Sequence, residues 1–131
     1  MLRPAKEGPD RLLALAEQAY AEIPEELRRH TEGIVFRVAD WADADTLEEM
    51  GIDDAYDLLG LYHGVSLDHQ SVYDSGRMPD MIWLYREPIL AYAADTGEAL
   101  ADVVRNVLVH EIGHHFGLSD DDMHAIEDED D

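Results

Sequence analysis

The chain has 131 residues, of which 46% are hydrophobic, and this is the size and composition of one globular domain. Its 31 acidic residues against 9 Lys and Arg give a formal net charge of −22. Such a charge disfavours nucleic acids and anionic membranes as partners, and it favours a basic peptide or protein, although solubility alone would also account for it. There is no Cys, which excludes disulfides and thiolate metal sites.

No targeting or membrane segment is visible in the sequence. Residues 1–9 lack the apolar run of a signal peptide, and no apolar stretch approaches the roughly 20 residues needed to cross a bilayer. We therefore expect a cytoplasmic protein that folds as a single domain over residues 1–131, with flexible ends at 1–9 and 128–131.

Two helices are expected first. Apolar residues recur at helical spacing from Leu12 to Ile23, behind Asp10 as a candidate N-cap. Pro24 and the two acids after it suit the first turn of a second helix, which should run to about His30.

Strands and short helices are expected in the middle of the chain. The expected strands are residues 34–38, 58–63 and 81–85. The expected short helices are residues 46–50 and 88–94, and residues 65–80 should form a long loop. In the first strand, Ile34, Phe36 and Val38 share one face. Helices followed by strands and then helices predict an α+β fold with a small sheet, rather than repeated βαβ units.

The most informative helix is expected to follow. Asp95 and Glu98 resemble a capping box at its start, and Gly117 can supply its C-terminal turn. A last short helix is expected over residues 121–127, before a nearly all-acidic tail.

The end of this long helix carries a constellation typical of metal chemistry. Residues 110–120 read His-Glu-Ile-Gly-His-His-Phe-Gly-Leu-Ser-Asp. At about 100° per residue, His114 lies about 40° from His110 and Glu111 about 100° from it. Two imidazoles can therefore bind one ion, with a carboxylate beside it.

The residues after the helix offer a third ligand. Gly117 lets the chain turn away from the helix axis, so Asp120 can come back toward the two imidazoles, which it could not do from a continuing helix. Asp121 or Asp122 could substitute for it.

This donor set predicts one zinc ion. A catalytic zinc site takes three protein ligands and keeps a fourth position for water, whose pKa the metal lowers toward neutrality. A carboxylate just off the ligand face, here Glu111, can accept the proton of that water and pass it to a leaving amine.

The apolar stripe of the same helix supports this interpretation. The stripe runs directly into the His-Glu-His face and consists of Leu100, Val103, Val104, Val107 and Leu108. The three polar groups should therefore face the interior or a cleft, where burial without a partner is costly and a metal ion is the natural compensation.

The histidines outside this face are not expected to bind the metal. His115 points away from the ligand face and should support the metal ligands from behind or act as a packing residue, rather than bind the metal. His63 and His69 should be exposed.

Trp83, Tyr85 and Tyr92 are expected in the core. A tyrosine could stabilise an oxyanion in a zinc peptidase. The sequence does not choose among the candidates Tyr62, Tyr73, Tyr85 and Tyr92.

The sequence resembles the Asp-zincins and metzincin-like peptidases, whose motif is His-Glu-x-x-His-x-x-Gly-x-x-His/Asp. The segments HEIGHHFGLSD, VVRNVLV, LLGLYHGV and MIWLYREPIL are similar to a bacterial family of small zincin-like metallopeptidases, over about residues 11–127. The resemblance implies a minimal zincin-like fold, zinc ligands His110, His114 and Asp120, and Glu111 as catalytic acid/base. The chain departs from the larger enzymes because only eleven residues follow Asp120. Met123 is expected at best to pack under the site, at a spacing that differs from their Met-turn, and no C-terminal wall of the cleft is expected.

Three functions are consistent with these features. The leading hypothesis is a zinc metallopeptidase that hydrolyses peptide bonds with a metal-activated water. The alternative is a zincin-fold metal-binding or partner-binding module with weak or lost proteolysis, which the small size and strong acidity favour. Hydrolysis of a non-peptide amide is the third.

Overall fold

Three strands form a mixed sheet at the centre of the computed structural model, which describes residues 8–64 and 80–117. The strands are β1 (Val35–Ala39), β2 (Gly60–His63) and β3 (Met81–Tyr85), in the spatial order β1-β3-β2. β1 pairs with β3 in parallel and β2 pairs with β3 antiparallel. All three expected strands are confirmed, and β2 lies at an edge of the sheet.

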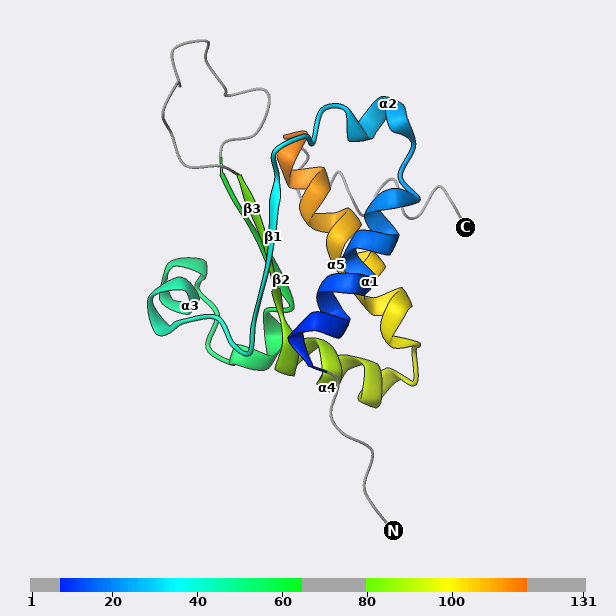
Figure 1. Ribbon diagram of the computed structural model, residues 1–131. Helices are drawn as coiled ribbons and strands as arrows, with labels where there is room; N and C mark the ends of the chain where they lie inside the picture. Colours follow the sequence, from blue (N-terminus) through cyan, green and yellow to red (C-terminus); the bar gives the residue numbers. More distant parts are fainter. Residues whose placement is uncertain (1–7, 65–79, 118–131) are drawn as a thin grey trace.

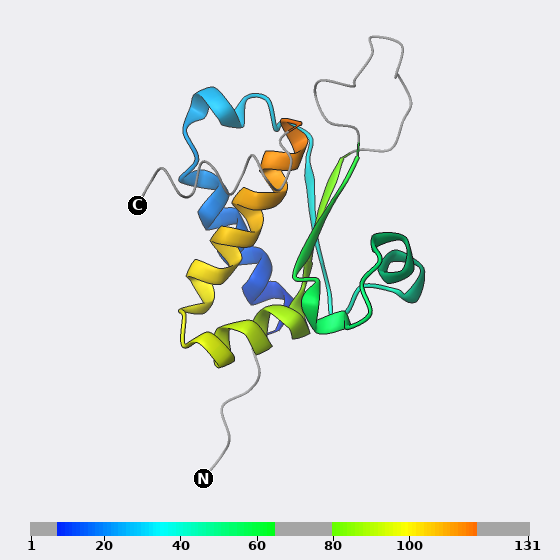
Figure 2. The same cartoon turned by 180° about the vertical axis from the view of Figure 1, so that it is seen from behind.

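Helices surround this sheet in the described part of the chain. They are α1 (Pro9–Ala21), α2 (Glu25–Arg28), α3 (Ala44–Met50), α4 (Arg86–Thr96) and α5 (Leu100–His115), with a 3-10 turn, η1 (Ala55–Asp57). Figures 1 and 2 show α1 and α5 on one face of the sheet, α3 on the other, and α4 at one end. The predicted α+β class is confirmed.

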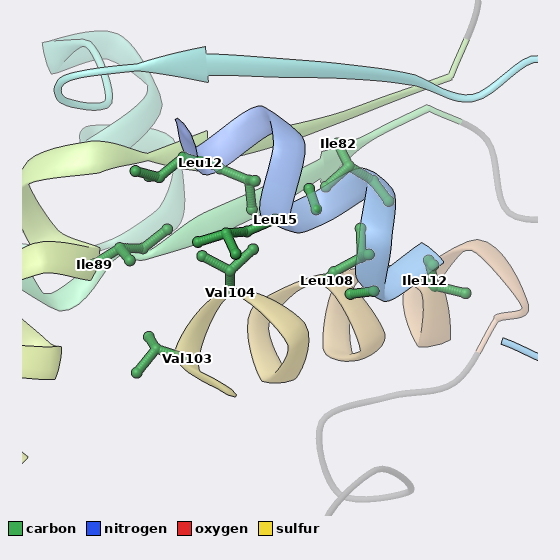
Figure 3. Packing of buried hydrophobic residues seen from close by; sticks show 11 residues of the cluster. Leu12, Leu15, Ile82, Ile89, Val103, Val104, Leu108 and Ile112 are labelled. Atoms are coloured by element: carbon green, nitrogen blue, oxygen red, sulfur yellow. The ribbon is translucent and has the colours of Figure 1, made fainter. Parts of the chain in front are cut away.

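The main core lies between α1, α5 and β3. Leu12 and Leu15 of α1 meet Val104 and Leu108 of α5, and Ile82 of β3 completes this layer (Figure 3). All five are at most 4% exposed. Residues at i, i+3 and i+4 bring these side chains onto one face of each helix, as the sequence pattern predicted.

β3 is buried on both faces. Ile82 and Leu84 join the main core, whereas Tyr85 packs with Ala42 and Leu58 in a second cluster on the α3 side. A central strand with two covered faces typically consists of a continuous run of bulky apolar residues, as residues 81–85 do.

The expected helix starts at Asp10 and Asp95 are wrong. α1 begins at Pro9 with Gly8 as its N-cap, so Asp10 lies inside the first turn. Asp95 belongs to α4, whose last residue is Thr96. The C-cap residue, Gly97, has a backbone conformation in the left-handed region. α5 then begins only at Leu100, without a side-chain cap. The reason is that α4 extends two residues beyond the expected end, which places the Asp95–Glu98 pair across a helix junction.

Several expectations fall outside the described residues. These are the loop at 65–79, the last helix at 121–127, the acidic tail and the N-terminal segment 1–7. Among the described residues, the model contains no helix with the length and apolar character needed to cross a membrane.

Tyr85 should make stability sensitive to alkaline pH. Its burial raises its pKa to about 12 from an ordinary 10.0, and the carboxylates of Asp43 and Glu111 add to the shift. Between these two pH values the unfolded chain loses the proton while the folded chain keeps it. This contribution is therefore complete below about pH 10 and is lost as the pH rises toward 12.

Tyr85→Phe has no proton to lose, so its free energy of unfolding should fall less between pH 9 and 12 than that of the wild type. The expected difference is on the order of 2–3 kcal/mol, measured by urea unfolding at each pH. Tyr56→Phe, at a tyrosine that is 52% exposed, is the matched control. Identical pH profiles for wild type and Tyr85→Phe would contradict the assignment.

Candidate metal centre

The last turns of α5 bring the three expected side chains together. One possible ligand atom from each of His110, Glu111 and His114 lies within 4.8 Å of the others. The two imidazole ring centroids are 5.1 Å apart. Glu111 is 8% exposed and the two histidines are partly buried. The structure therefore gathers two imidazoles and one buried carboxylate at one point.

Packing determines which way this face of α5 points. Val103, Val104 and Leu108 are buried in the core, whereas Asp102 and Arg105 are exposed and form an ion pair of 3.2 Å on the outer side. The helix is thereby locked in the phase that the sequence predicted. The His-Glu-His face follows from this phase because it continues the buried stripe by one further turn.

α5 ends where the sequence predicted. The backbone N–H of Gly117 donates to the carbonyl of His114, and Gly117 has a φ of +84°, in the left-handed region that favours glycine. Asp120 lies outside the described residues, as do Asp121 and Asp122. The third ligand therefore remains a prediction.

The edge strand holds the Glu111 carboxylate. The backbone N–H of Tyr62 in β2 donates to Glu111 Oε1 over 2.9 Å. This bond joins residues that are 49 positions apart, so helical spacing alone could not reveal it. A buried carboxylate needs such a donor, because an unpaired one would be expensive to desolvate.

His115 fixes the other end of Tyr62. His115 Nε2 lies 2.7 Å from the carbonyl oxygen of His30, which can only accept, so Nε2 carries a proton. His115 Nδ1 forms a hydrogen bond of 2.8 Å with the Tyr62 hydroxyl. Asp80 Oδ2 lies 3.5 Å from the same nitrogen. His115 is 3% exposed, so its predicted role as a packing residue is confirmed.

A cleft of about 790 Å³ opens over the three side chains. It is lined by residues of α5 and β2, by the end of α3 with the segment that follows it through η1, and by Tyr92 of α4. Apart from the three side chains its lining is mainly apolar, with Asp57, Asn106, Tyr62 and Tyr92 as the residues that carry polar side chains. An apolar cleft with a few converging polar groups is the usual form of a ligand site.

Of the three aromatic residues that were expected in the core, two are found there. Tyr85 is buried and Trp83 packs against the second cluster, but Tyr92 is 44% exposed and lines the cleft. Tyr92 lies on the side of α4 that faces the cleft, and its expected core position is therefore wrong. His63 is exposed as predicted, and His69 and Tyr73 lie outside the described residues.

Gly60 allows β2 to approach α5 closely. A Cβ at this position would lie 2.5 Å from Cγ1 of Val107 and 3.0 Å from the carbonyl oxygen of Trp83. Any side chain would push the strand away from the helix, and Tyr62, two residues further along β2, would move with it. The glycine thus sets the distance across which Tyr62 reaches Glu111.

Gly60→Ala should lower the free energy of unfolding by about 2 kcal/mol, because the methyl group cannot fit without a backbone shift. It should also speed hydrogen exchange at the Tyr62 amide, since the bond to Glu111 is weakened. Gly8→Ala is the control, because a Cβ there meets nothing within 4 Å and its φ is an ordinary −85°. This variant should change stability by only about 0.5 kcal/mol. Equal effects at the two sites would refute the close approach.

Comparison with known protein families agrees with this geometry. The model of a family described as zincin-like metallopeptidase matches residues 31–130, a range that includes all the candidate site residues. A search of curated proteins found none that matches the chain.

Proposed function

Because the chain belongs to the zincin-like metallopeptidase family, we propose that it is a peptidase that works with one zinc ion. The observation that carries this proposal is the convergence of His110, Glu111 and His114, within 4.8 Å, in a cleft beside an edge strand. A helix that used its histidines only for packing would have no reason to direct all three groups into an open cleft.

The donor set fits zinc. Neutral imidazole nitrogens and carboxylate oxygens are ordinary zinc ligands, and the chain has no thiolate that would compete with them. We assign His110, His114 and Asp120 as the ligands, with Asp120 carried by the family motif and by the turn at Gly117. A bound zinc ion would polarise a substrate carbonyl and make water a better nucleophile at neutral pH.

Glu111 is assigned as the general base and acid. One of its oxygens accepts the Tyr62 N–H, and this bond orients the carboxylate at the edge of the cleft. Glu111 then takes a proton from the attacking water and passes it to the leaving amine. Orientation by a backbone donor matters because the carboxylate need not reorganise during the reaction.

The substrate is proposed to be an extended peptide that lies along β2. In the antiparallel β2–β3 pair, the Leu59 carbonyl accepts from the Tyr85 N–H, so alternate residues face β3. The main-chain groups of Gly60 and Tyr62 therefore face the other side. There the Tyr62 N–H is bonded to Glu111, so pairing with the peptide is assigned to the main-chain groups of Gly60. Addition of a strand at a sheet edge is a common mode of peptide binding.

Charge favours neutral or basic peptides. The net charge of −22 attracts cations, and among the described residues that line the cleft there is no Lys or Arg. Asp57, the last residue of η1, adds a carboxylate to the lining of the cleft. Acidic peptides should therefore be poor substrates, and nucleic acids are not proposed as partners.

Glu111→Gln should keep zinc and lose turnover. The amide cannot accept a proton from water, so kcat on a peptide library should fall at least about 100-fold, while zinc content stays at the wild-type level. Steady-state kinetics and elemental analysis of the same samples measure both. Glu98→Gln, at an exposed acid just before α5, is the control and should retain activity.

Unchanged turnover in Glu111→Gln would refute the assigned role. A zinc-loaded wild type that cleaves no peptide, basic ones included, would favour the metal-binding or partner-binding module instead.

A further inference from the structure

The cleft has two chemically different walls. Gly60 and Tyr62 face α5, because Gly60 approaches Val107 and Tyr62 reaches Glu111. Leu61 lies between them and faces the opposite side of the sheet, where it packs against the second cluster. The α5 side of the cleft therefore carries His110, Glu111 and His114, whereas on the other side Met50, Ile52 and Leu61 are apolar and Asp57 of η1 is the charged residue.

We define the α3-side wall as Met50, Ile52 and Leu61, all of which line the cleft. Met50 is the last residue of α3 and is 49% exposed. Ile52 and Leu61 are partly buried. Half-exposed methionine at the rim of a cleft contributes little to the core, so its contacts are available to a ligand.

The C-terminal turn of α3 holds this wall in place. Gly51 has a φ of +69°, its N–H donates to the Glu48 carbonyl, and the Ile52 N–H donates to the Leu47 carbonyl over 2.9 Å. This pair of bonds is a Schellman motif, which a residue other than glycine at position 51 would strain. Leu47 and Ile52 pack against the same cluster, so Ile52 is anchored from both its backbone and its side chain.

We propose that the α3-side wall is a subsite that selects substrates with a bulky apolar side chain close to the cleaved bond. Successive side chains of an extended peptide point to opposite sides. In a peptide along β2, one set would face the His-Glu-His groups of α5 and the alternate set would face this wall. This inference rests on the proposed function and specifies its substrate class.

Apolar burial and charge both support a Leu-like or Phe-like residue here. An apolar side chain that leaves water for this wall gains binding free energy in proportion to the area covered. A carboxylate at the same position would lose its hydration without a partner, next to a protein whose net charge is −22. The subsite should therefore reject Asp and Glu most strongly.

A second apolar groove lies behind α5, lined in part by Leu27 and Val109, which are 47% and 42% exposed. Nothing in the structure indicates what would cover this groove, so it carries no proposal. Leu27 is, however, a useful control, because its exposure is close to that of Met50 and it lies outside the cleft.

The test uses peptides in which each position around the cleaved bond carries Leu, its near-isostere Asn, or Asp in turn. In the wild type, kcat/KM at one position should be about tenfold higher for Leu than for Asn, and lower still for Asp. Met50→Lys should reduce the Leu-to-Asn ratio to within about twofold, whereas Met50→Leu should keep it. Leu27→Lys should leave it unchanged. Thermal unfolding of each variant checks that the fold is intact. Ile52→Val is a second and smaller change to the same α3-side wall.

The same ratios measured as peptide binding to zinc-loaded Glu111→Gln separate this inference from the proposed function. If the wild type cleaves nothing but this variant binds Leu peptides in preference to Asn peptides, the subsite stands and the peptidase proposal fails. The subsite is overturned if no position prefers Leu, if Met50→Lys keeps the preference, if Leu27→Lys abolishes it equally, or if no peptide binds at all.

Discussion

Burial of the apolar stripe of α5 against α1 and β3 fixes the rotation of that helix about its axis. Val104 and Leu108 are fully buried, and Ile112 is nearly so. Once these side chains are placed, the periodicity of 3.6 residues per turn determines the direction in which His110 and His114 leave the helix. The position of the candidate metal centre is thus a consequence of ordinary core packing, and the site needs no dedicated scaffold beyond one long helix and the strand beside it.

The polar groups at this face are tied into the fold by a short chain of hydrogen bonds. Glu111 is held by the Tyr62 backbone, and the Tyr62 hydroxyl by His115, which in turn bonds the His30 carbonyl. These hydrogen bonds connect β2, α5 and the segment after α2. Because Glu111 and His115 are buried and Tyr62 is partly buried, loss of one of these bonds should cost about 1–3 kcal/mol. Such mutual dependence is how a small domain can hold a carboxylate in one orientation beside a cleft.

Local sequence patterns predicted the fold class, the three strands and the shared face of His110, Glu111 and His114, because each depends on spacing within one element. The period of α5 placed Val104, Leu108 and His110 correctly, and the apolar run at residues 81–85 indicated a strand. The bond from Tyr62 to Glu111 could not be predicted, because it depends on how β2 meets α5 in three dimensions. Gly60 was the one available signal for it, since a glycine inside a strand often marks a close backbone approach. Tyr92 was misplaced because an aromatic residue in a helix is usually buried, and only the packing of α4 at the end of the sheet reveals the cleft beside it.

The central claim is that two imidazoles one helical turn apart, at the end of α5, bind a divalent metal. Elemental analysis of protein purified without chelator, together with a zinc competition titration, tests this most directly. The account predicts about one zinc per chain in the wild type, and the same in His63→Ala, which removes an exposed histidine away from the site. In His114→Ala zinc should be lost, with an affinity at least about 100-fold weaker. A wild type that takes up no zinc, or a His114→Ala variant that binds it as tightly as the wild type, would contradict the account.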